Sequence, residues 1–427
     1  MSEPVPQDVL LDFVYALGTC VREYADYLRE EGAPVNDPLL HPAPIEIGGS
    51  VFEPLIVLRG SLLLKHWFGD RARVAGDIDL HCFRSSRPVV ISDGDDSTFY
   101  GDSYESLVDY GKAMCRYSAQ SADADYSRWN RDTTFPHLDT VDEATDLWAY
   151  GTPGQRYFTQ WRRSNGENGR LQIDIAEEGY CTFDRLDISV TEFVVGNEPL
   201  PFLTYSPETM LAAKLSWLLR GISVIPNETD DRLWMEWTGE AKDLFDTWLL
   251  LTEGHLNAES FQKSLLGFTL DDDIPWISLS ALMTCHYEYH DSMEFPGWNA
   301  FTEAHPDLVD SPPIEMLRAI AERLRPLLGP FHIPEEEGFL RSISDDVTDE
   351  ASYQIYADLL EEQGDVRCEY VRTFAQLYFH RDDDEAIRQA HRQQLSNLQE
   401  LVPAAWLIRL WGSPAQSGEM LRRVMTE

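Results

Sequence analysis

The sequence of 427 residues has no long hydrophobic run. No segment approaches the roughly 18 consecutive apolar residues that a membrane-spanning helix needs. The chain begins MSEPVPQDVLLDF, and it lacks the basic flank that precedes the apolar residues of a secretory signal. We therefore expect a soluble, cytoplasmic protein that makes no contact with a membrane.

Cysteine is scarce, and the six that are present lie far apart without a Cys-x-x-Cys pair. This spacing argues against a zinc knuckle and a disulfide framework, and it favours a reducing compartment. His286 and His290 have the i, i+4 spacing that suits zinc, but no clear third ligand accompanies them. A packed or surface histidine pair is the simpler interpretation.

Basic residues are few, with 34 Lys and Arg against 74 Asp and Glu and a formal charge of −40. A surface of that sign repels a nucleic-acid backbone unless basic side chains are concentrated locally, so broad nucleic-acid binding is disfavoured. The same acidity suits divalent cations. Apolar residues are plentiful at 43%, which is enough for the cores of two or three domains.

Apolar periodicity divides the chain into three predicted parts. Residues 8–32 have the spacing of an amphipathic helix, and strand-like segments follow it. A segment rich in proline and glycine, near residues 326–334, marks a later boundary. The predicted parts are an α/β core over residues 1–205 with an insertion near 93–150, a helical half over 206–332, and a small helical module over 333–427.

The sharpest chemical signal is an acid pair on a predicted strand, Asp77 to Phe83. Asp77 and Asp79 are two residues apart, so their carboxylates point to the same face and can bind one or two hard cations. A solvated sheet face is the alternative. A predicted strand over 52–58 lies before them in the sequence.

Between these two strands, Gly60 and Ser61 form a small turn at the start of a predicted helix over 62–68. A turn of this kind offers unpaired backbone N–H groups and a hydroxyl to a phosphate, in the direction that the helix dipole favours. Together with the acid pair it would hold a metal-bound triphosphate.

Asp174 lies between Ile173 and Ile175 on a later predicted strand. If that strand neighbours the first, its carboxylate joins the acid pair, although Asp184 and Asp187 are nearby competitors. Three clustered carboxylates repel one another, and a divalent cation between them makes the cluster tolerable. One of them can then deprotonate an attacking hydroxyl.

Two cationic residues are candidates for binding phosphate. Lys214 shares its helical register with Met210 and Leu218, and a buried ammonium needs an anion such as a nucleotide phosphate. A lysine that reaches the surface is the alternative. Arg73 could clamp a phosphate or simply pair with Asp70.

These motifs resemble the nucleotidyltransferase core of the AbiEii/AbiGii toxin family, a branch of the polymerase-beta-like superfamily. The resemblance is carried by residues 58–61 and 71–80, and by helical-half motifs at 211–215, Arg220 and 242–246. Their order and approximate spacing match the family across about residues 45–255.

The resemblance implies a fold class and a set of residue roles. The fold would be α/β, a polymerase-beta-like mixed sheet with helices, followed by a helical half and a small helical C-terminal domain. Gly60 and Ser61 would form the triphosphate turn, Asp77 and Asp79 would hold magnesium, Lys214 would bind the nucleotide phosphates, and Asp243 would be an active-site acid. The alternative for Asp243 is a solvated acid beside an i, i+4 pair of Lys242 and Asp246. Three positions depart from the family pattern: Arg59, Ala75 and Ala213.

A second resemblance covers about residues 335–382. The run from Tyr356 to Asp365 is similar to a short repeat-companion domain abundant in planctomycete bacteria, with Leu359 in place of its tryptophan. That domain has no assigned chemistry. We expect a helix that ends at Gly364, a second helix packed on it, and a docking role.

The sequence thus predicts a metal-dependent nucleotidyltransferase that uses Mg²⁺ or Mn²⁺ and a nucleoside triphosphate. The acceptor would be a hydroxyl of RNA or tRNA, of a protein or of a small molecule. By resemblance, the protein would be the toxin of a toxin–antitoxin or phage-defence system, with a cognate antitoxin. The alternative is a degenerate nucleotide-binding or interaction protein that acts through its C-terminal module. The predicted site residues are Asp77, Asp79, Asp174 and Asp243 (catalytic), Gly60, Ser61, Arg73 and Lys214 (nucleotide-binding), and Asp77, Asp79 and Asp174 (metal).

Overall fold

A computed structural model describes the chain in segments that form two compact units. One unit comprises Met1–Phe183 with Ile188–Ser206, and the other Asp184–Asp187 with Pro207–Glu427. The described residues are 5–7, 9–11, 14, 45–47, 50–52, 56–83, 133–134, 142–146, 154–163, 167–178, 186–195, 198–226, 233–272, 278–279, 282–283, 295–309, 311–328, 334–380 and 385–411. The division into three domains stays a prediction.

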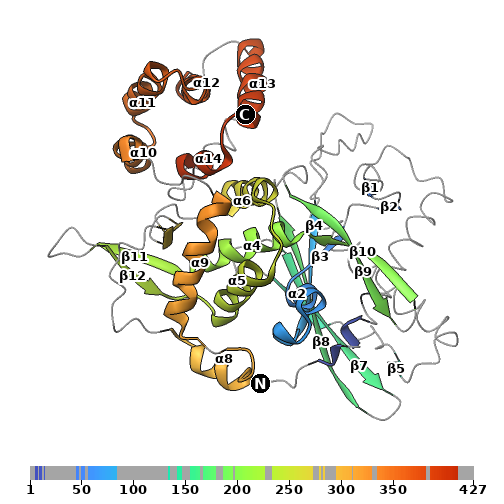
Figure 1. The fold of residues 1–427 in the computed structure, drawn as a ribbon. Coiled ribbons are helices and arrows are strands. Elements are labelled where there is room, and N and C mark those ends of the chain that lie inside the picture. Colours follow the sequence, from blue (N-terminus) through green and yellow to red (C-terminus); the bar gives the residue numbers. More distant parts are fainter. Residues whose placement is uncertain are drawn as a thin grey trace, which may run out of the picture. The chain divides into compact units, whose positions relative to one another are not determined.

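The first unit is built on an eight-stranded mixed sheet (Figure 1), so the predicted α/β class is confirmed. Its main path runs β5-β7-β8-β4-β3-β10-β9, and β6 pairs with β7. The pairs β4–β8 and β3–β10 are parallel, and the others are antiparallel. The strands are β3 (Ile56–Arg59), β4 (Asp77–Phe83), β5 (Thr133–Thr134), β6 (Asp142–Asp146), β7 (Gly154–Arg163), β8 (Asn168–Glu178), β9 (Ile188–Val195) and β10 (Glu198–Tyr205).

Alternation in β4 separates an apolar face from an acidic face. Ile78 and Leu80 are buried, whereas Asp77 and Asp79 are half-buried on the opposite face. Helix α2 (Ser61–Phe68) packs against β3 and β4, and it buries three consecutive leucines that begin at Leu62. The core of this unit therefore fixes the strand that carries the acid pair.

Several predicted boundaries shift in the structure. The segment 52–58 is divided between β2 (Ser50–Phe52), which pairs with β1 (Ile45–Ile47), and β3. Within the predicted opening helix over residues 8–32, the structure describes residues 9–11 and 14, and they are helical. Strand β7 was not predicted, and the short strands β5 and β6, from the predicted insertion, pair with it.

The second unit is mainly helical, with one hairpin that helical periodicity did not predict. The hairpin is formed by β11 (Ile222–Pro226) and β12 (Leu233–Trp237). The described helices are α4 (Pro207–Arg220), α5 (Ala241–Glu253), α6 (Ala258–Asp272), α8 (Trp298–Ala304), α9 (Pro313–Leu328), α10 (Pro334–Asp345), α11 (Glu350–Glu362), α12 (Arg367–Phe379), α13 (Glu385–Leu401) and α14 (Ala404–Trp411). Among these described helices, none is long and apolar enough to cross a membrane.

Helix α4 is buried along almost its whole length because α5 and α6 both pack against it. Its charged residues Glu208 and Lys214 are consequently buried as well. The Glu208 carboxylate accepts a hydrogen bond from the backbone N–H of Asn257 at 2.7 Å, just before α6 begins. Each buried charge on α4 therefore has a partner inside the protein.

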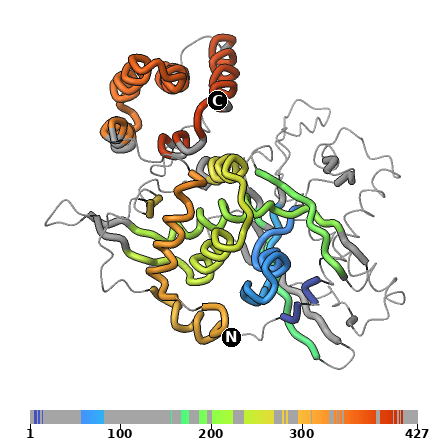
Figure 2. The backbone as a smooth tube through the Cα atoms, viewed as in Figure 1, coloured from blue at the N-terminus to red at the C-terminus, as the bar shows by residue number. Residues whose placement is uncertain are grey.

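Helices α11 and α12 lie side by side (Figures 1 and 2), as the sequence predicted. Asp349 caps the start of α11 by accepting a hydrogen bond from the Ala351 N–H. Gly364 follows the C-cap residue Gln363 and has a φ of 69°, which is the left-handed conformation that glycine favours at helix ends. The expected stop at Gly364 is therefore confirmed.

A buried polar network links these helices to α10 and α14. Arg367 donates two hydrogen bonds to Glu336, at 3.0 and 2.8 Å, and also pairs with Asp365. Tyr356 donates to Glu336 at 2.7 Å and accepts from the Trp406 indole N–H at 2.8 Å. Burial raises the pKa of the Tyr356 phenol well above its usual value, so the phenol stays a donor.

Substitution of Glu336 tests how much this network contributes to the stability of the helices α10 to α14. We expect Glu336→Ala to lower the free energy of unfolding by about 3 to 5 kcal/mol, because Arg367 and Tyr356 lose their shared buried acceptor. Chemical denaturation followed by circular dichroism measures this change. Glu335→Ala, at the exposed neighbouring position, should cost less than about 0.5 kcal/mol. Equal losses for the two variants would show that the network contributes nothing.

Candidate active site

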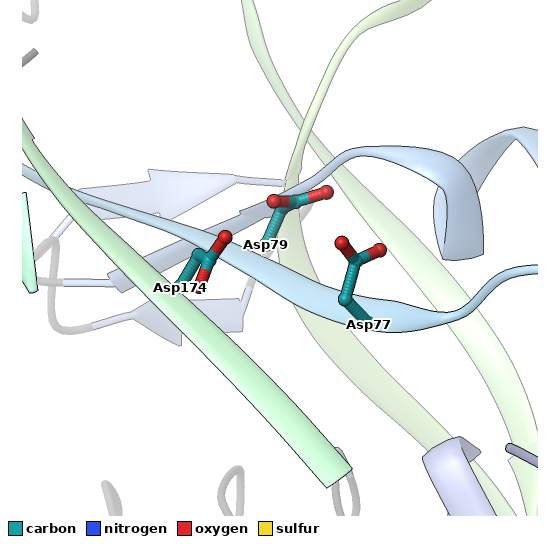
Figure 3. A group of neighbouring side chains, drawn as sticks. All are labelled: Asp77, Asp79 and Asp174. Carbon is teal, nitrogen blue, oxygen red and sulfur yellow. The ribbon is translucent and has the colours of Figure 1, made fainter. Parts of the chain in front are cut away.

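The register of the sheet brings the three predicted acids together (Figure 3). Strands β4 and β8 pair in parallel with Asp79 directly opposite Asp174, so the expected pairing of these strands is confirmed. One carboxylate oxygen from each of Asp77, Asp79 and Asp174 lies within 4.8 Å of the others. Hard oxygen ligands at this spacing fit a divalent cation such as Mg²⁺ or Mn²⁺.

Gly60 allows the turn before α2 to approach the acid pair. Its φ of 86° and ψ of −162° fall in a region that is almost restricted to glycine. A Cβ atom added at Gly60 would lie 2.0 Å from Oδ2 of Asp79. Two features therefore require glycine at position 60: the backbone conformation and the nearby Asp79 carboxylate.

Ser61 ties the same turn to the other acid of the pair. Its side chain is buried, and Oγ donates a hydrogen bond to Oδ1 of Asp77 at 3.3 Å. Helix α2 begins at Ser61, so the backbone N–H groups of its first turn lie near the acid cluster. The structure thus places the predicted phosphate turn and the predicted metal ligands at one location.

Asp174 is held by two residues that the sequence analysis missed. Arg156 on β7 donates from Nε to Oδ1 at 2.8 Å and from Nη2 to Oδ2 at 2.7 Å. Gln172 donates to Oδ2 at 3.0 Å. The Tyr, Phe, Thr and Trp residues of 154–163 are typical of a strand, and this composition could have identified β7.

Two of the acids, Asp79 and Asp174, lie within a row of charges that crosses four strands. Arg59 on β3 lies opposite Asp79, and Arg156 on β7 lies opposite Asp174. The row therefore reads positive, negative, negative, positive across β3, β4, β8 and β7. Arg59 is buried, and it occupies the position where the family often has a glycine.

His81 continues the acidic face of β4 but adds no positive charge. The ring is fully buried, and Nδ1 forms a short hydrogen bond with the hydroxyl of Tyr205. Burial, together with the nearby Arg59 charge, holds the pKa of His81 well below its usual value. His81 is therefore neutral near pH 7.

Of the two acids considered beside Asp174, Asp187 is the one that the structure describes. Asp187 belongs to the other compact unit, and its backbone N–H donates to Oγ1 of Thr209 at 2.9 Å. Asp184 lies outside the described residues, as do His286 and His290.

Lys214 is buried, and the anions that pair with it come from the protein itself. Its Nζ lies 3.0 Å from Asp243 and 2.9 Å from Asp246, both on α5, and 4.8 Å from the ring centre of Trp217. Only 3% of the lysine side chain is exposed, so it does not reach the surface. Asp243 is buried too, and the nucleotide roles of Lys214 and Asp243 stay predictions.

Arg73 is half-buried in the segment before β4. Its alternative partner, Asp70, is exposed and pairs with Lys65 at 3.2 Å. The assignment of Arg73 to phosphate also stays a prediction.

A protein-family model described as "Nucleotidyl transferase AbiEii toxin, Type IV TA system" matches residues 47–363, about three quarters of the chain. The chain belongs to the AbiEii family. It is therefore a nucleotidyltransferase, and the match includes Gly60, Ser61 and all three acids of the cluster. The match runs past residue 333 and ends within the predicted C-terminal module, whose resemblance to the planctomycete domain stays a prediction.

Other comparisons add little to this assignment. A solved structure described as an antigenic nucleotidyltransferase-like protein from Paracoccidioides brasiliensis is 12% identical over 71% of this chain and 92% of its own. Its TM-score of 0.27 is too low to bear on the fold. No curated protein matches the sequence.

The contact between Gly60 and Asp79 predicts that an added methyl group disrupts the site. Gly60→Ala should displace the Asp79 carboxylate and weaken Mn²⁺ binding about tenfold or more, as measured by isothermal titration calorimetry. Gly69→Ala is the matched control, because Gly69 ends the same helix with a φ of 57° but has nothing within 4 Å of an added Cβ.

Both variants should lose about 1 to 3 kcal/mol of stability from backbone strain. Only Gly60→Ala should lose Mn²⁺ affinity. Equal Mn²⁺ affinity for the two variants would contradict the inferred contact.

Proposed function

We propose that this AbiEii protein transfers a nucleoside monophosphate from a nucleoside triphosphate to a hydroxyl acceptor in a metal-dependent reaction. The observation that supports the proposal is the position of Asp77, Asp79 and Asp174 beside the Gly60–Ser61 turn. Nucleotidyl transfer needs groups that bind the phosphates next to groups that hold the cation balancing the phosphate charge. Both groups lie here on adjacent strands and one helix.

The donor set fits a divalent metal ion. All three candidate ligands are carboxylates, which suit Mg²⁺ and Mn²⁺ rather than softer metals. Three acids at this spacing repel one another strongly unless positive charge is placed among them. A bound ion would supply that charge and would polarise the α-phosphate and the pyrophosphate leaving group.

The protein's own groups would act as follows. The backbone N–H groups at the start of α2 would hold the triphosphate. The acceptor oxygen attacks the α-phosphorus, an O–P bond forms, and the bond to the β-phosphate oxygen breaks with pyrophosphate leaving. The acceptor hydroxyl loses its proton to one of the three carboxylates of the cluster. Arg73 would contact the phosphates. For Lys214 and Asp243, which pair with each other in the other compact unit, the roles of phosphate ligand and further acid stay predictions.

The family implies a toxin with an antitoxin partner, and phage defence is the proposed setting. The acceptor remains among RNA or tRNA, a protein and a small molecule. The formal charge of −40 disfavours a large nucleic-acid surface unless basic side chains gather locally.

A second candidate function is a degenerate protein that binds nucleotide and acts through its C-terminal module. Ala75 and Ala213, which replace the polar residues usual in the family, favour this reading. The cluster argues against this second function, because a protein without catalytic activity has no evident need to keep three repelling carboxylates with oxygens within 4.8 Å of one another.

Transfer of a labelled nucleotide distinguishes the two functions. Purified protein would be incubated with each α-³²P-labelled nucleoside triphosphate, Mg²⁺ or Mn²⁺, and separately with tRNA, total protein and small hydroxyl compounds. We expect one acceptor class to become labelled and Asp77→Asn to reduce the rate on the order of 1000-fold, because metal charge stabilisation supplies several kcal/mol.

Asp70→Asn is the matched control for this assay, since Asp70 is an exposed acid of the same unit that lies outside the cluster and pairs with Lys65. It should keep full activity. Nucleotide binding without transfer to any acceptor class would favour the degenerate binder.

Toxicity provides a cellular test of the same site. Induced expression of the wild-type chain in a bacterial host should arrest growth, and Asp79→Asn should abolish the arrest at equal protein level because a metal ligand is lost. Growth curves with immunoblots measure both quantities. Arrest that persists in Asp79→Asn would mean that toxicity does not depend on the acid cluster.

A further inference from the structure

Arg156 is an unassigned residue that binds a predicted metal ligand directly. It faces Asp174 across the antiparallel β7–β8 pair, and its guanidinium contacts both carboxylate oxygens, at 2.8 and 2.7 Å. The pair is mostly shielded from water, with 22% of the Arg156 side chain and 12% of the Asp174 side chain exposed. A paired fork of this kind fixes the plane of a carboxylate.

The hydrogen bonds of Asp174 occupy most of the acceptor positions on its carboxylate, so few remain for a metal ion. A carboxylate has about four acceptor positions, two on each oxygen. Oδ2 accepts from both Arg156 and Gln172, and Oδ1 accepts from Arg156 alone. One acceptor position therefore remains, and it lies on Oδ1.

Asp77 and Asp79 are held differently. Asp77 accepts a long hydrogen bond from Ser61, at 3.3 Å, and Asp79 lies against the backbone of Gly60. At Asp174, the Arg156 guanidinium contacts both carboxylate oxygens and sets the orientation of the carboxylate.

We infer that Arg156 is a positioning residue, whose guanidinium fork fixes Asp174 so that a single acceptor position on Oδ1 is presented to a divalent cation. This inference rests on the proposed function, since it assigns a residue that orients a metal ligand of the same site. The positioning role differs from simple charge neutralisation, because a point charge at residue 156 would attract Asp174 without fixing the plane of its carboxylate.

Arg156→Lys separates these two contributions. Lysine keeps the positive charge, so the electrostatic attraction of the cluster for a cation is nearly unchanged, but it loses the planar fork. We expect Mn²⁺, titrated alone into nucleotide-free protein, to bind about 10- to 100-fold more weakly, which is the usual effect of losing a group that orients a metal ligand. Isothermal titration calorimetry measures this affinity.

A double-mutant cycle tests whether Arg156 acts through Asp174. In the Asp174→Asn background, Arg156→Lys should change Mn²⁺ affinity by less than about twofold, because the oriented carboxylate is already lost. Arg372→Lys is the matched control, since Arg372 on α12 also bridges two acids, Asp358 and Glu361 on α11, but at more exposed positions. It should bind Mn²⁺ like the wild type.

The outcomes separate this inference from the proposed function. Wild-type Mn²⁺ affinity in Arg156→Lys, or a loss that persists in the Asp174→Asn background, would overturn the positioning role even if nucleotide transfer occurs. A loss that depends on Asp174, in a protein that transfers no nucleotide, would support the positioning role while the proposed function fails. A thermal melt of each variant identifies any loss that comes from unfolding.

Discussion

Repulsion among three carboxylates is the constraint on which this structure depends. Two unit charges 4 Å apart repel by roughly 4 kcal/mol at an effective dielectric constant of about 20. The cluster contains three pairs of carboxylates, with oxygens within 4.8 Å of one another. The sheet offsets part of this cost with an arginine at each end of the row, Arg59 beside Asp79 and Arg156 beside Asp174. Asp174 is buried because its charge is paired there. The remaining negative charge is what makes the cluster attractive to a divalent cation.

The turn before α2 gives this negative charge its chemical context. Gly60 removes the side chain that would collide with Asp79, and Ser61 connects the first turn of the helix to Asp77. A helix start attracts anions, whereas the acid cluster repels them. The two can serve one ligand only if positive charge lies between them, which is the arrangement expected for a metal-bound triphosphate. Membership of the AbiEii family agrees with this chemistry. The identity of the acceptor depends on surfaces beyond the cluster.

Local patterns in the sequence predicted those parts of the site that depend on one strand or one turn. The spacing of Asp77 and Asp79 and the Gly60–Ser61 turn could be read directly, whereas Asp174 required an assumption about strand pairing that the register confirms. Arg156 could not be predicted, because its contact depends on the register of β7, a strand that was not recognised. The burial of Lys214 was expected, but its partner Asp246 comes from another helix, and amphipathic periodicity does not show which helices meet.

The central claim is that the acids of β4 and β8 together bind a divalent cation. Anomalous diffraction from crystals soaked in Mn²⁺ with a non-hydrolysable nucleoside triphosphate tests it most directly. The account predicts an anomalous peak within about 2.0 to 2.6 Å of oxygens from Asp77, Asp79 and Asp174, with the triphosphate beside Gly60 and Ser61. Nucleotide bound at the turn with no peak at the carboxylates, or a peak that excludes Asp174, would contradict it.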